Sequence, residues 1–369
     1  MSRRGVAISP FFAFLALACS AESPTDGPLG GQPGVSGSPA TSGAGGGAQA
    51  GNTSGGNGTT AGSAGTPGGG TGGMAGGSGG GGGGGATQGG SAGSGGGGST
   101  MSPGCGKDVT DDPTQWKTHD ITVAIDAKFD AGYANRRYWT RPPAGYDKSK
   151  PYPLTIWGQG CGQGNNPENT PMTIGPAAAA SVQVELLAPQ NQPNHCYYAG
   201  PDGDDAKTPE LPYFDQVLAE TLNNFCIDTS QVFMGGYSSG AWLSALISCN
   251  RADKVRGVGW AAGGLQLNHD ECTGKVAAII TRGVNDNGTP LAQTEAARDS
   301  LIMRNGCTTQ TMPWLPGETA FDTSSCVEYQ GCMPGYPVIW CPTPGGHTNT
   351  INDSKLSPQG FWKFWSTLP

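Results

Sequence analysis

Glycine is distributed so unevenly along this chain that a single domain cannot span it. Of the 65 glycines in 369 residues, 38 precede residue 105, where they make up more than a third of the segment. Such a segment cannot bury enough apolar surface to offset the entropy lost on ordering. It has no strict Gly-X-Y period, which excludes a collagen triple helix. The later part is long enough for one large domain with a sizeable core.

The first residues have the pattern of an export signal. Two arginines precede an apolar run at 6–18, which is too short to span a membrane. We therefore predict a signal peptide at 1–18. The run ends in Leu-Ala-Leu-Ala-Cys19, which resembles the lipobox of bacterial lipoproteins, although Ala16 stands where those boxes usually have leucine. The resemblance implies acylation of Cys19; ordinary secretion is the alternative.

Residues 19–104 are expected to form a disordered tether. The segment consists mainly of Gly, Ser, Ala, Thr and Pro and contains no aromatic residue. About 85 residues of such a flexible coil have a root-mean-square span of roughly 50 Å. The tether would connect the exported N-terminus to a domain at 105–369, placed outside the cell or at its surface.

Cysteine usage and charge narrow the class of this domain. Ten cysteines lie between positions 105 and 341, and none forms a C-x-x-C pair. Together with the export signal, they predict five disulfides and an oxidising compartment, and they give no support to zinc ribbons or thioredoxin-like sites. The net charge is −8 and there is no basic tract, so nucleic acid is not an expected partner.

Short apolar runs alternate with helical patterns through the domain. This alternation predicts an α/β fold with a mostly parallel central sheet that is covered by helices on both faces. The predicted helices lie at 211–225, 241–249 and 291–304. The predicted strands lie at 121–125, 138–140, 154–157, 182–187, 232–235, 258–262, 276–281 and 338–340.

The segment Gly236-Tyr-Ser-Ser-Gly240 matches the G-x-S-x-G pattern. Two further matches at 76–80 and 89–93 fall in the glycine-rich segment. Only the copy at Ser238 follows an apolar strand and opens a helix, the context that gives the pattern meaning. Its glycines permit a tight turn that lifts the serine hydroxyl out of the sheet. Ser238 is therefore the candidate nucleophile.

A serine hydroxyl needs a base, and the base needs an acid that orients it. Of the four histidines, only His347 follows the last predicted strand. Asp286 lies just past the strand at 276–281 and gives the chain order serine, acid, histidine. Asp270 and Asp322 also lie between the serine and the histidine, but neither follows a strand that the pattern defines.

Two backbone amides are expected to stabilise an oxyanion. One is that of Ser239, which follows the nucleophile, and the other belongs to the glycine-rich loop at 158–162, where Cys161 is the candidate. Gln159 and Trp242 are candidate substrate-binding residues. No cofactor or metal is expected, because the best metal-ligand cluster, at 269–272, lacks two histidines at helical spacing.

These motifs resemble a known family, the secreted feruloyl esterases and polyhydroxybutyrate depolymerases of carbohydrate esterase family one, within the α/β-hydrolases. The run 226–233 (CIDTSQVF) leads into G-x-S-x-G as it does there. The segments Gly283-Val-Asn-Asp286 and Gly345-Gly-His-Thr348 resemble the family's acid and histidine loops. The resemblance covers 105–369 and implies serine-dependent ester hydrolysis through an acyl-enzyme.

The chain departs from the family's pattern in three places. Gln159 stands where the family usually has histidine, which bears on the oxyanion loop. Tyr237 and Thr348 stand where some feruloyl esterases and tannases have two bridging cysteines, so that subgroup is disfavoured.

Several alternatives remain open within this reading. The expected partner is an ester substrate, and the leading prediction is a feruloyl ester of plant cell-wall polysaccharide. The alternative functions are a polyhydroxybutyrate depolymerase, an acetylxylan esterase, and a non-catalytic binding module displayed on a surface. A membrane would be contacted only through the lipid anchor. Loops at 191–212 and 312–335 are expected to roof the site. Aspartates in the first loop would disfavour anionic substrates or bind calcium; they are Asp202, Asp204 and Asp205.

Overall fold

The computed structural model describes residues 101–112, 115–162, 180–190, 195–197, 208–264, 272–347 and 356–369. The chain divides into two units, 1–94 and 95–369, and all the described residues belong to the second. The predicted signal peptide, Cys19 and nearly all of the tether lie outside the described residues. So do the aspartates at 202–205 and most of the segment 269–272, which was considered and rejected as a metal site.

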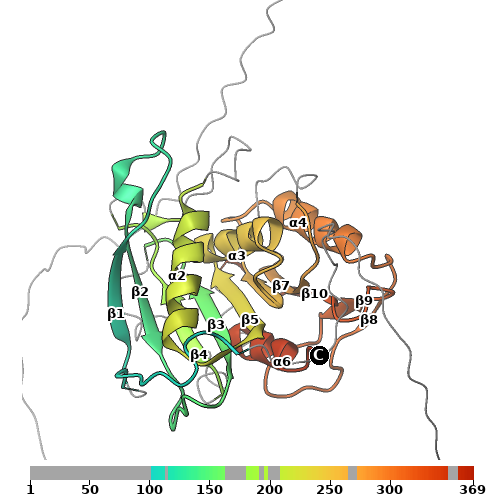
Figure 1. Cartoon of the computed structure of the whole chain (residues 1–369). Coiled ribbons are helices and arrows are strands. Elements are labelled where there is room, and N and C mark those ends of the chain that lie inside the picture. Colours follow the sequence, from blue (N-terminus) through green and yellow to red (C-terminus); the bar gives the residue numbers. More distant parts are fainter. Residues whose placement is uncertain are drawn as a thin grey trace, which may run out of the picture. The chain divides into compact units, whose positions relative to one another are not determined.

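The described residues form a ten-stranded sheet in the order β1-β2-β4-β3-β5-β6-β7-β10-β9-β8 (Figure 1). Neighbours from β4 to β10 pair in parallel, whereas β2 runs antiparallel to both of its neighbours and β9 to both of its own. The strands are β1 (Lys117–Thr122), β2 (Asn135–Arg141), β3 (Tyr152–Gly158), β4 (Val182–Leu186), β5 (Ile227–Tyr237), β6 (Gly257–Ala261), β7 (Ala277–Gly283), β8 (Thr311–Pro313), β9 (Val327–Tyr329) and β10 (Val338–Thr343).

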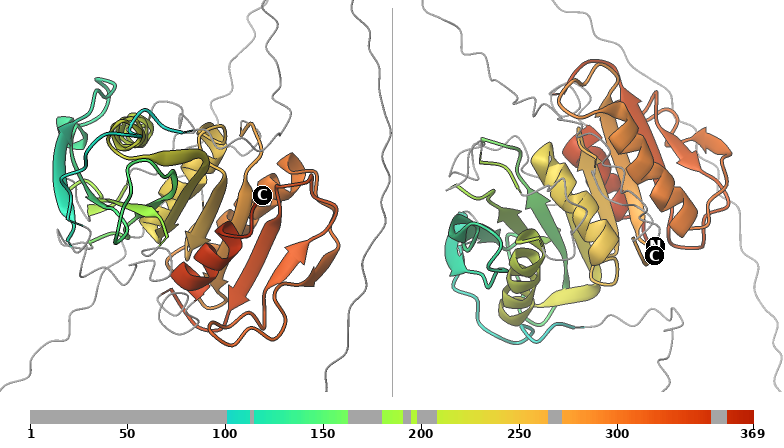
Figure 2. Two further views of the ribbon diagram at one scale, coloured as in Figure 1. Left: turned by 60° about the horizontal axis from the view of Figure 1, so that its bottom comes forward. Right: turned by 90° about the horizontal axis from the view of Figure 1, so that it is seen from above.

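Helices lie on both faces of this sheet, as predicted. α2 (Glu210–Asn224) connects β4 to β5, and α3 (Ser239–Asn250) connects β5 to β6. α4 (Leu291–Arg304) belongs to the crossover from β7 to β10, which also contains β8 and β9. All three crossovers move in the same direction along the sheet, so right-handed connections place them on one face. The short helix α6 (Phe361–Trp365), preceded by η6 (Leu356–Gly360), covers the other face (Figure 2). A single turn, η1 (Ala131–Tyr133), precedes β2.

Successive side chains of a strand point to opposite faces of the sheet, so apolar residues of the same strand contribute to a hydrophobic core on each face. Leu154 and Ile156 of β3 pack on the side of α2, α3 and α4, and Trp157 packs on the side of α6. On that second face the rings of Phe233 and Trp365 are stacked with their centroids 5.4 Å apart. Because both faces are covered, β3 to β7 are almost continuously buried, which explains their apolar sequence.

The strand predictions are wrong in detail at the two ends of the sheet. β1 lies at 117–122 rather than 121–125, and β8 and β9 were not predicted. The predicted roof at 312–335 contains these two strands, and its Trp314 and Phe321 are buried in the same core as Phe364 of α6. Its large aromatic side chains are therefore part of the core. Most of the other predicted roof, 191–212, lies outside the described residues.

The ten cysteines form five disulfides, which confirms the prediction from their number. Five disulfides indicate an extracellular protein. The pairs are Cys105–Cys226, Cys161–Cys196, Cys249–Cys272, Cys307–Cys332 and Cys326–Cys341.

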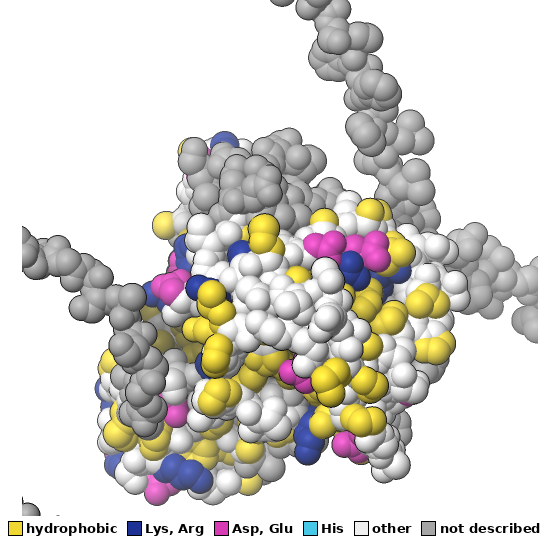
Figure 3. All heavy atoms as spheres, turned by 90° about the vertical axis from the view of Figure 1, so that its right-hand side faces the viewer, with side chains coloured by type: hydrophobic (Ala, Val, Ile, Leu, Met, Phe, Trp, Pro, Cys, Tyr) yellow, Lys and Arg dark blue, Asp and Glu magenta, His cyan; other side chains and the backbone are white. Residues whose placement is uncertain are grey.

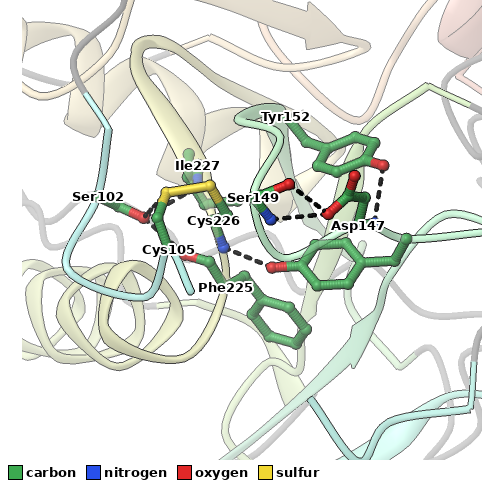
Figure 4. The surroundings of a disulfide bond; sticks show 9 residues. Ser102, Cys105, Asp147, Ser149, Tyr152, Phe225, Cys226 and Ile227 are labelled. Carbon is green, nitrogen blue, oxygen red and sulfur yellow. Dashed lines mark hydrogen bonds between the residues drawn. A yellow bond between two sulfur atoms is a disulfide. The ribbon is translucent and has the colours of Figure 1, made fainter. Parts of the chain in front are cut away.

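The first disulfide fixes the beginning of the domain to the amino end of β5 (Figure 4). Ser102 Oγ donates to the Phe225 carbonyl at 2.6 Å and accepts from the Ile227 amide at 2.9 Å. The Cys226 amide donates to the Tyr146 hydroxyl at 2.6 Å. Residues before the predicted boundary at 105 are therefore already part of the folded domain.

The surface at the β8–β10 end of the sheet mixes hydrophobic with charged side chains (Figure 3). Three exposed methionines belong to segments at this end: Met303, Met312 and Met333. Across the described part of the chain, no helix combines the length and the apolar character needed to cross a bilayer.

Candidate active site

Ser238 occupies a sharp turn between the end of β5 and the start of α3. Its backbone has φ 53° and ψ −117°, a conformation that side chains other than glycine rarely adopt. The turn is held because the Ser238 amide donates to the Ala261 carbonyl at 2.9 Å, and the Ser238 carbonyl accepts from the amides of Ala241 and Trp242. The strain is thus maintained by the sheet and the helix on either side.

Glycines allow the strands and the helix to approach closely at this turn. A Cβ at Gly240 would collide with the Gly158 carbonyl at the end of β3, and one at Gly236 would collide with the Gly240 carbonyl. The G-x-S-x-G pattern therefore has the physical basis that was expected of it.

Ser238, His347 and Asp286 form a continuous hydrogen-bonded chain. His347 Nε2 lies 2.9 Å from Ser238 Oγ, and His347 Nδ1 lies 2.9 Å from both carboxylate oxygens of Asp286. The three residues follow β5, β10 and β7, whose carboxyl ends share one edge of the sheet. An ionised Asp286 accepts only, so Nδ1 carries the proton and Nε2 is left to accept from the serine hydroxyl.

The surroundings of Asp286 keep it ionised. Its side chain is fully buried, which by itself would raise its pKa. The hydrogen bond from His347, electrostatic attraction to that residue once it is protonated, and the amides of Gly288 and Thr289 outweigh burial and hold the pKa of Asp286 below its ordinary value. The carboxylate can therefore orient His347 and stabilise its protonated form.

Tyr237 packs beside the histidine without competing for its proton. The ring centroids of Tyr237 and His347 lie 5.2 Å apart. Burial, assisted by the charge of Asp286, raises the pKa of Tyr237 to about 12. The Tyr237 phenol therefore stays neutral at physiological pH. His347 is the group that can accept the hydroxyl proton of Ser238.

Both predicted oxyanion donors belong to segments that border the nucleophile. Ser239 is the first residue of α3, where unpaired amides and the helix dipole favour negative charge. A Cβ at Gly160 would lie 3.3 Å from Ser238 Cβ, so the loop after β3 runs directly against the serine. Cys161, the next residue, is half-exposed and is bonded to Cys196.

The two predicted substrate-binding side chains lie in different surroundings. Gln159 is fully buried, and its Nε2 donates to Glu185 Oε1 of β4 at 2.8 Å. This hydrogen bond holds the predicted oxyanion loop against the sheet. The Gln159 side chain is therefore not available to a substrate, and any contact of Gln159 with the substrate would be made by its backbone. Trp242 is half-buried in the first turn of α3, four residues after Ser238.

Glu185 is a residue of the site region that the sequence reasoning missed. It is buried in β4, where a carboxylate needs a partner. The sequence contained an indication of this role, because Glu185 is the one charged residue in the otherwise uncharged predicted strand 182–187. Among the described residues, no group of three or more His, Cys, Asp or Glu side chains is arranged to hold a metal ion.

The sheet is mostly parallel and has helices on both faces. At its carboxyl edge a strained serine is hydrogen-bonded to a histidine, which is hydrogen-bonded to a buried aspartate. These features define a serine hydrolase of the α/β-hydrolase class.

Comparison with known sequences agrees with this class. The chain is 30% identical over 278 residues to feruloyl esterase D of Neurospora crassa, covering 72% of this chain and 90% of that protein. It is 27% identical over 273 residues to feruloyl esterase C of Emericella nidulans, with the same coverage.

The chain belongs to the feruloyl esterase family, and it is a carboxylic ester hydrolase of the serine type. The alternative of a non-catalytic binding module is therefore set aside. No protein-family model matches the chain.

Solved structures with a similar fold include other esterases. An acetyl xylan esterase from Aspergillus awamori matches 66% of this chain and 99% of its own, with a TM-score of 0.48 and 12% identity. The CE1 ferulic acid esterase of the anaerobic fungus Anaeromyces mucronatus matches 69% of this chain and 90% of its own, with a TM-score of 0.44 and 16% identity. The fold assignment rests on the sheet and its connections described above.

Proposed function

We propose that this protein hydrolyses feruloyl esters of plant cell-wall polysaccharides, with Ser238 as nucleophile, His347 as general base and acid, and Asp286 as the orienting carboxylate. The hydrogen-bonded chain from Ser238 through His347 to Asp286 carries the proposal for the residues. The proposal for the substrate rests on the names of the relatives, which are feruloyl esterases.

Each half of the reaction uses the same groups. Ser238 Oγ attacks the ester carbonyl carbon while His347 Nε2 takes the hydroxyl proton. The negative oxygen of the tetrahedral intermediate is stabilised by the amides of Ser239 and Cys161. Collapse of the intermediate breaks the bond between the carbonyl carbon and the sugar oxygen, His347 gives its proton to that oxygen so that the sugar leaves as an alcohol, and an acyl-enzyme remains. Water then attacks with His347 as base, which releases ferulate and restores the serine.

The distribution of aromatic side chains favours this substrate over a solid polyester. A polyester depolymerase was an alternative because nine tryptophans and ten tyrosines were available for an aromatic binding surface. All nine tryptophans and nine of the ten tyrosines lie among the described residues, and none of these side chains is exposed. Six of the tryptophans are buried: Trp139, Trp157, Trp260, Trp314, Trp340 and Trp365.

Replacing Ser238 by alanine tests the proposal. Ser238→Ala should lower kcat for methyl ferulate by on the order of 10⁴-fold or more, because the covalent step is lost. Ser248→Ala is the matched control, since its hydroxyl bonds only the Ala245 carbonyl of its own helix among the described atoms. A fluorophosphonate probe should label the parent chain and not Ser238→Ala. Undiminished ferulate release by Ser238→Ala would contradict the assignment, and faster cleavage of acetylated xylan than of methyl ferulate would favour the acetylxylan alternative.

We also propose that residues 1–18 are a signal peptide and that 19–104 form a flexible tether anchored through acylated Cys19. The support is the pattern of residues in the sequence, and the tether would hold the enzyme at a cell surface. Metabolic labelling with a fatty acid should mark the parent chain but not Cys19→Ala. Equal labelling of both chains, or of neither, would contradict the anchor.

A further inference from the structure

A cavity of about 430 Å³ opens on the same edge of the sheet as Ser238, at the end drawn on the left of Figure 1. It is lined by the carboxyl end of β1, the amino end of β2 and residues 187–190, which follow β4. Because β2 runs antiparallel to both β1 and β4, these ends meet at the edge where β5 delivers the nucleophile. The volume is in the range of small-ligand sites.

Polar side chains form one wall of this cavity. In the antiparallel register Asp120 faces Arg137, and Thr122 faces Asn135. Alternate residues of a strand share a face, so these four side chains lie on the same side of the ladder. Thr122 and Asn135 are exposed. The wall therefore presents hydroxyl, amide, carboxylate and guanidinium groups next to one another.

The charges of this wall are already paired. Arg137 donates to both oxygens of Asp120, at 2.6 and 2.9 Å. Arg136, which also lines the cavity, is paired with buried Glu210 at 2.8 Å. With each cation matched to a carboxylate, the wall has no net charge to draw in an anion such as phosphate. It favours a neutral ligand that can both donate and accept hydrogen bonds.

The remaining wall is apolar and leads back to the catalytic loop. Leu187, Ala188 and Pro189 are buried beneath the cavity. Gln190 Oε1 lies 3.2 Å from Nδ1 of His195, the neighbour of Cys196. Cys196 is bonded to Cys161 beside the nucleophile. Three strand spacings, about 14 Å, separate β5 from β2 along this edge.

We propose that this cavity is a subsite for neutral sugar residues of the polysaccharide that carries the ester, at a distance from the bond that is cleaved. A sugar ring offers hydroxyl groups to the polar wall and C–H faces to the apolar one. The inference rests on the proposed function, because it requires the ester to be attached to a carbohydrate. It deepens that function by assigning a site to the part of the substrate that does not react.

Binding without turnover provides the first test. The full chain with Ser238→Ala is titrated calorimetrically with an unesterified arabinoxylo-oligosaccharide. Adding Thr122→Ala or Asn135→Ala should raise the Kd roughly three- to tenfold, the loss of one hydrogen bond. Thr118→Ala is the matched control, because Thr118 is an exposed threonine on the same face of β1 and does not line the cavity. Its Kd should not change.

Kinetics with Ser238 intact provides the second test. Thr122→Ala should lower the ratio of kcat/KM for a feruloylated oligosaccharide to kcat/KM for methyl ferulate, and Thr118→Ala should leave this ratio unchanged. Equal binding by the Thr122 and Thr118 variants, or no binding by their common parent, would overturn the subsite. The titration needs no turnover, so it still measures oligosaccharide binding at the subsite if methyl ferulate proves not to be a substrate.

Discussion

Asp286 retains its charge in a buried position because the protein directs several donors at it. His347 contacts both of its oxygens, and the amides of Gly288 and Thr289 reach one of them. Gly288 also leaves space for the imidazole, because a Cβ there would lie 2.8 Å from His347 Nδ1. The acid loop therefore both fixes the charge and shapes the position of the base.

Asp286→Asn should lower kcat by on the order of 10³- to 10⁴-fold, because an amide can hold the histidine in the wrong tautomer. The effect on stability depends on pH. The folded pKa of Asp286 lies below its unfolded value of about 3.9, so its contribution is complete above that pH and is lost as the pH falls through the folded pKa. The free energy of unfolding of Asp286→Asn should therefore depend less on pH below about 4, measured by urea unfolding.

Asp322→Asn is the control for this assignment. Asp322 was the other candidate acid that lies in the described part of the chain, and it caps the exposed turn at Ser324. Its replacement should leave kcat unchanged. A large loss of kcat in Asp322→Asn, with little loss in Asp286→Asn, would reverse the assignment of the acid.

At the scale of elements, the sequence predicted the strands in the middle of the sheet. β3 to β7 are covered on both faces, so their residues form continuous apolar runs that are visible without a structure. β1 and β8 lie at the edges and are largely exposed, so hydropathy does not mark them. The motif context, the positions after predicted strands and the chain order together predicted Ser238, Asp286 and His347 as the candidate triad. The buried hydrogen bond between Gln159 and Glu185 joins the loop after β3 to β4, and no local pattern in the sequence indicates it.

The disulfide Cys161–Cys196 should matter for catalysis as well as for stability. It connects the predicted oxyanion loop to the segment after β4. In Cys161→Ser/Cys196→Ser the Cys161 amide loses this restraint, so kcat for methyl ferulate should fall, by up to about 10²-fold, the loss found when an oxyanion donor is removed. KM should change less, since the restraint acts on the intermediate. Steady-state kinetics at a temperature where both variants remain folded measure the effect.

Removing Cys307–Cys332 is the comparison for that experiment. It closes a segment of 25 residues, against 35 for Cys161–Cys196. Both losses should cost about 2–4 kcal/mol of stability. Only the first should lower kcat; an equal kcat in the two variants would show that the oxyanion loop does not need the disulfide.

At the scale of the whole molecule, Met101 and Ser102 already belong to the catalytic domain. A chain that starts at Met101 retains Ser102 and the Cys105–Cys226 disulfide. Its Tm and its kcat/KM for methyl ferulate should equal those of the full chain, because the glycine-rich segment is expected to contribute no packing. A chain that starts at Lys107 lacks both contacts and should have a Tm lower by several degrees, since a disulfide typically contributes about 2–4 kcal/mol.

Calorimetry and ester kinetics on the three chains measure this difference. Loss of activity on soluble methyl ferulate in the chain from Met101 would show that the early segment belongs to the catalytic unit.

The bond between Cys105 and Cys226 also decides where a mechanical load would enter the domain. If the protein is held by its N-terminus, tension reaches the fold first at Met101 and Ser102 and then at this covalent joint, and it passes into the amino end of β5. That strand runs through the middle of the sheet and ends at Tyr237, directly before Ser238. A load from that side would thus be carried by a strand in the middle of the sheet, and it would enter this strand at the end opposite Ser238.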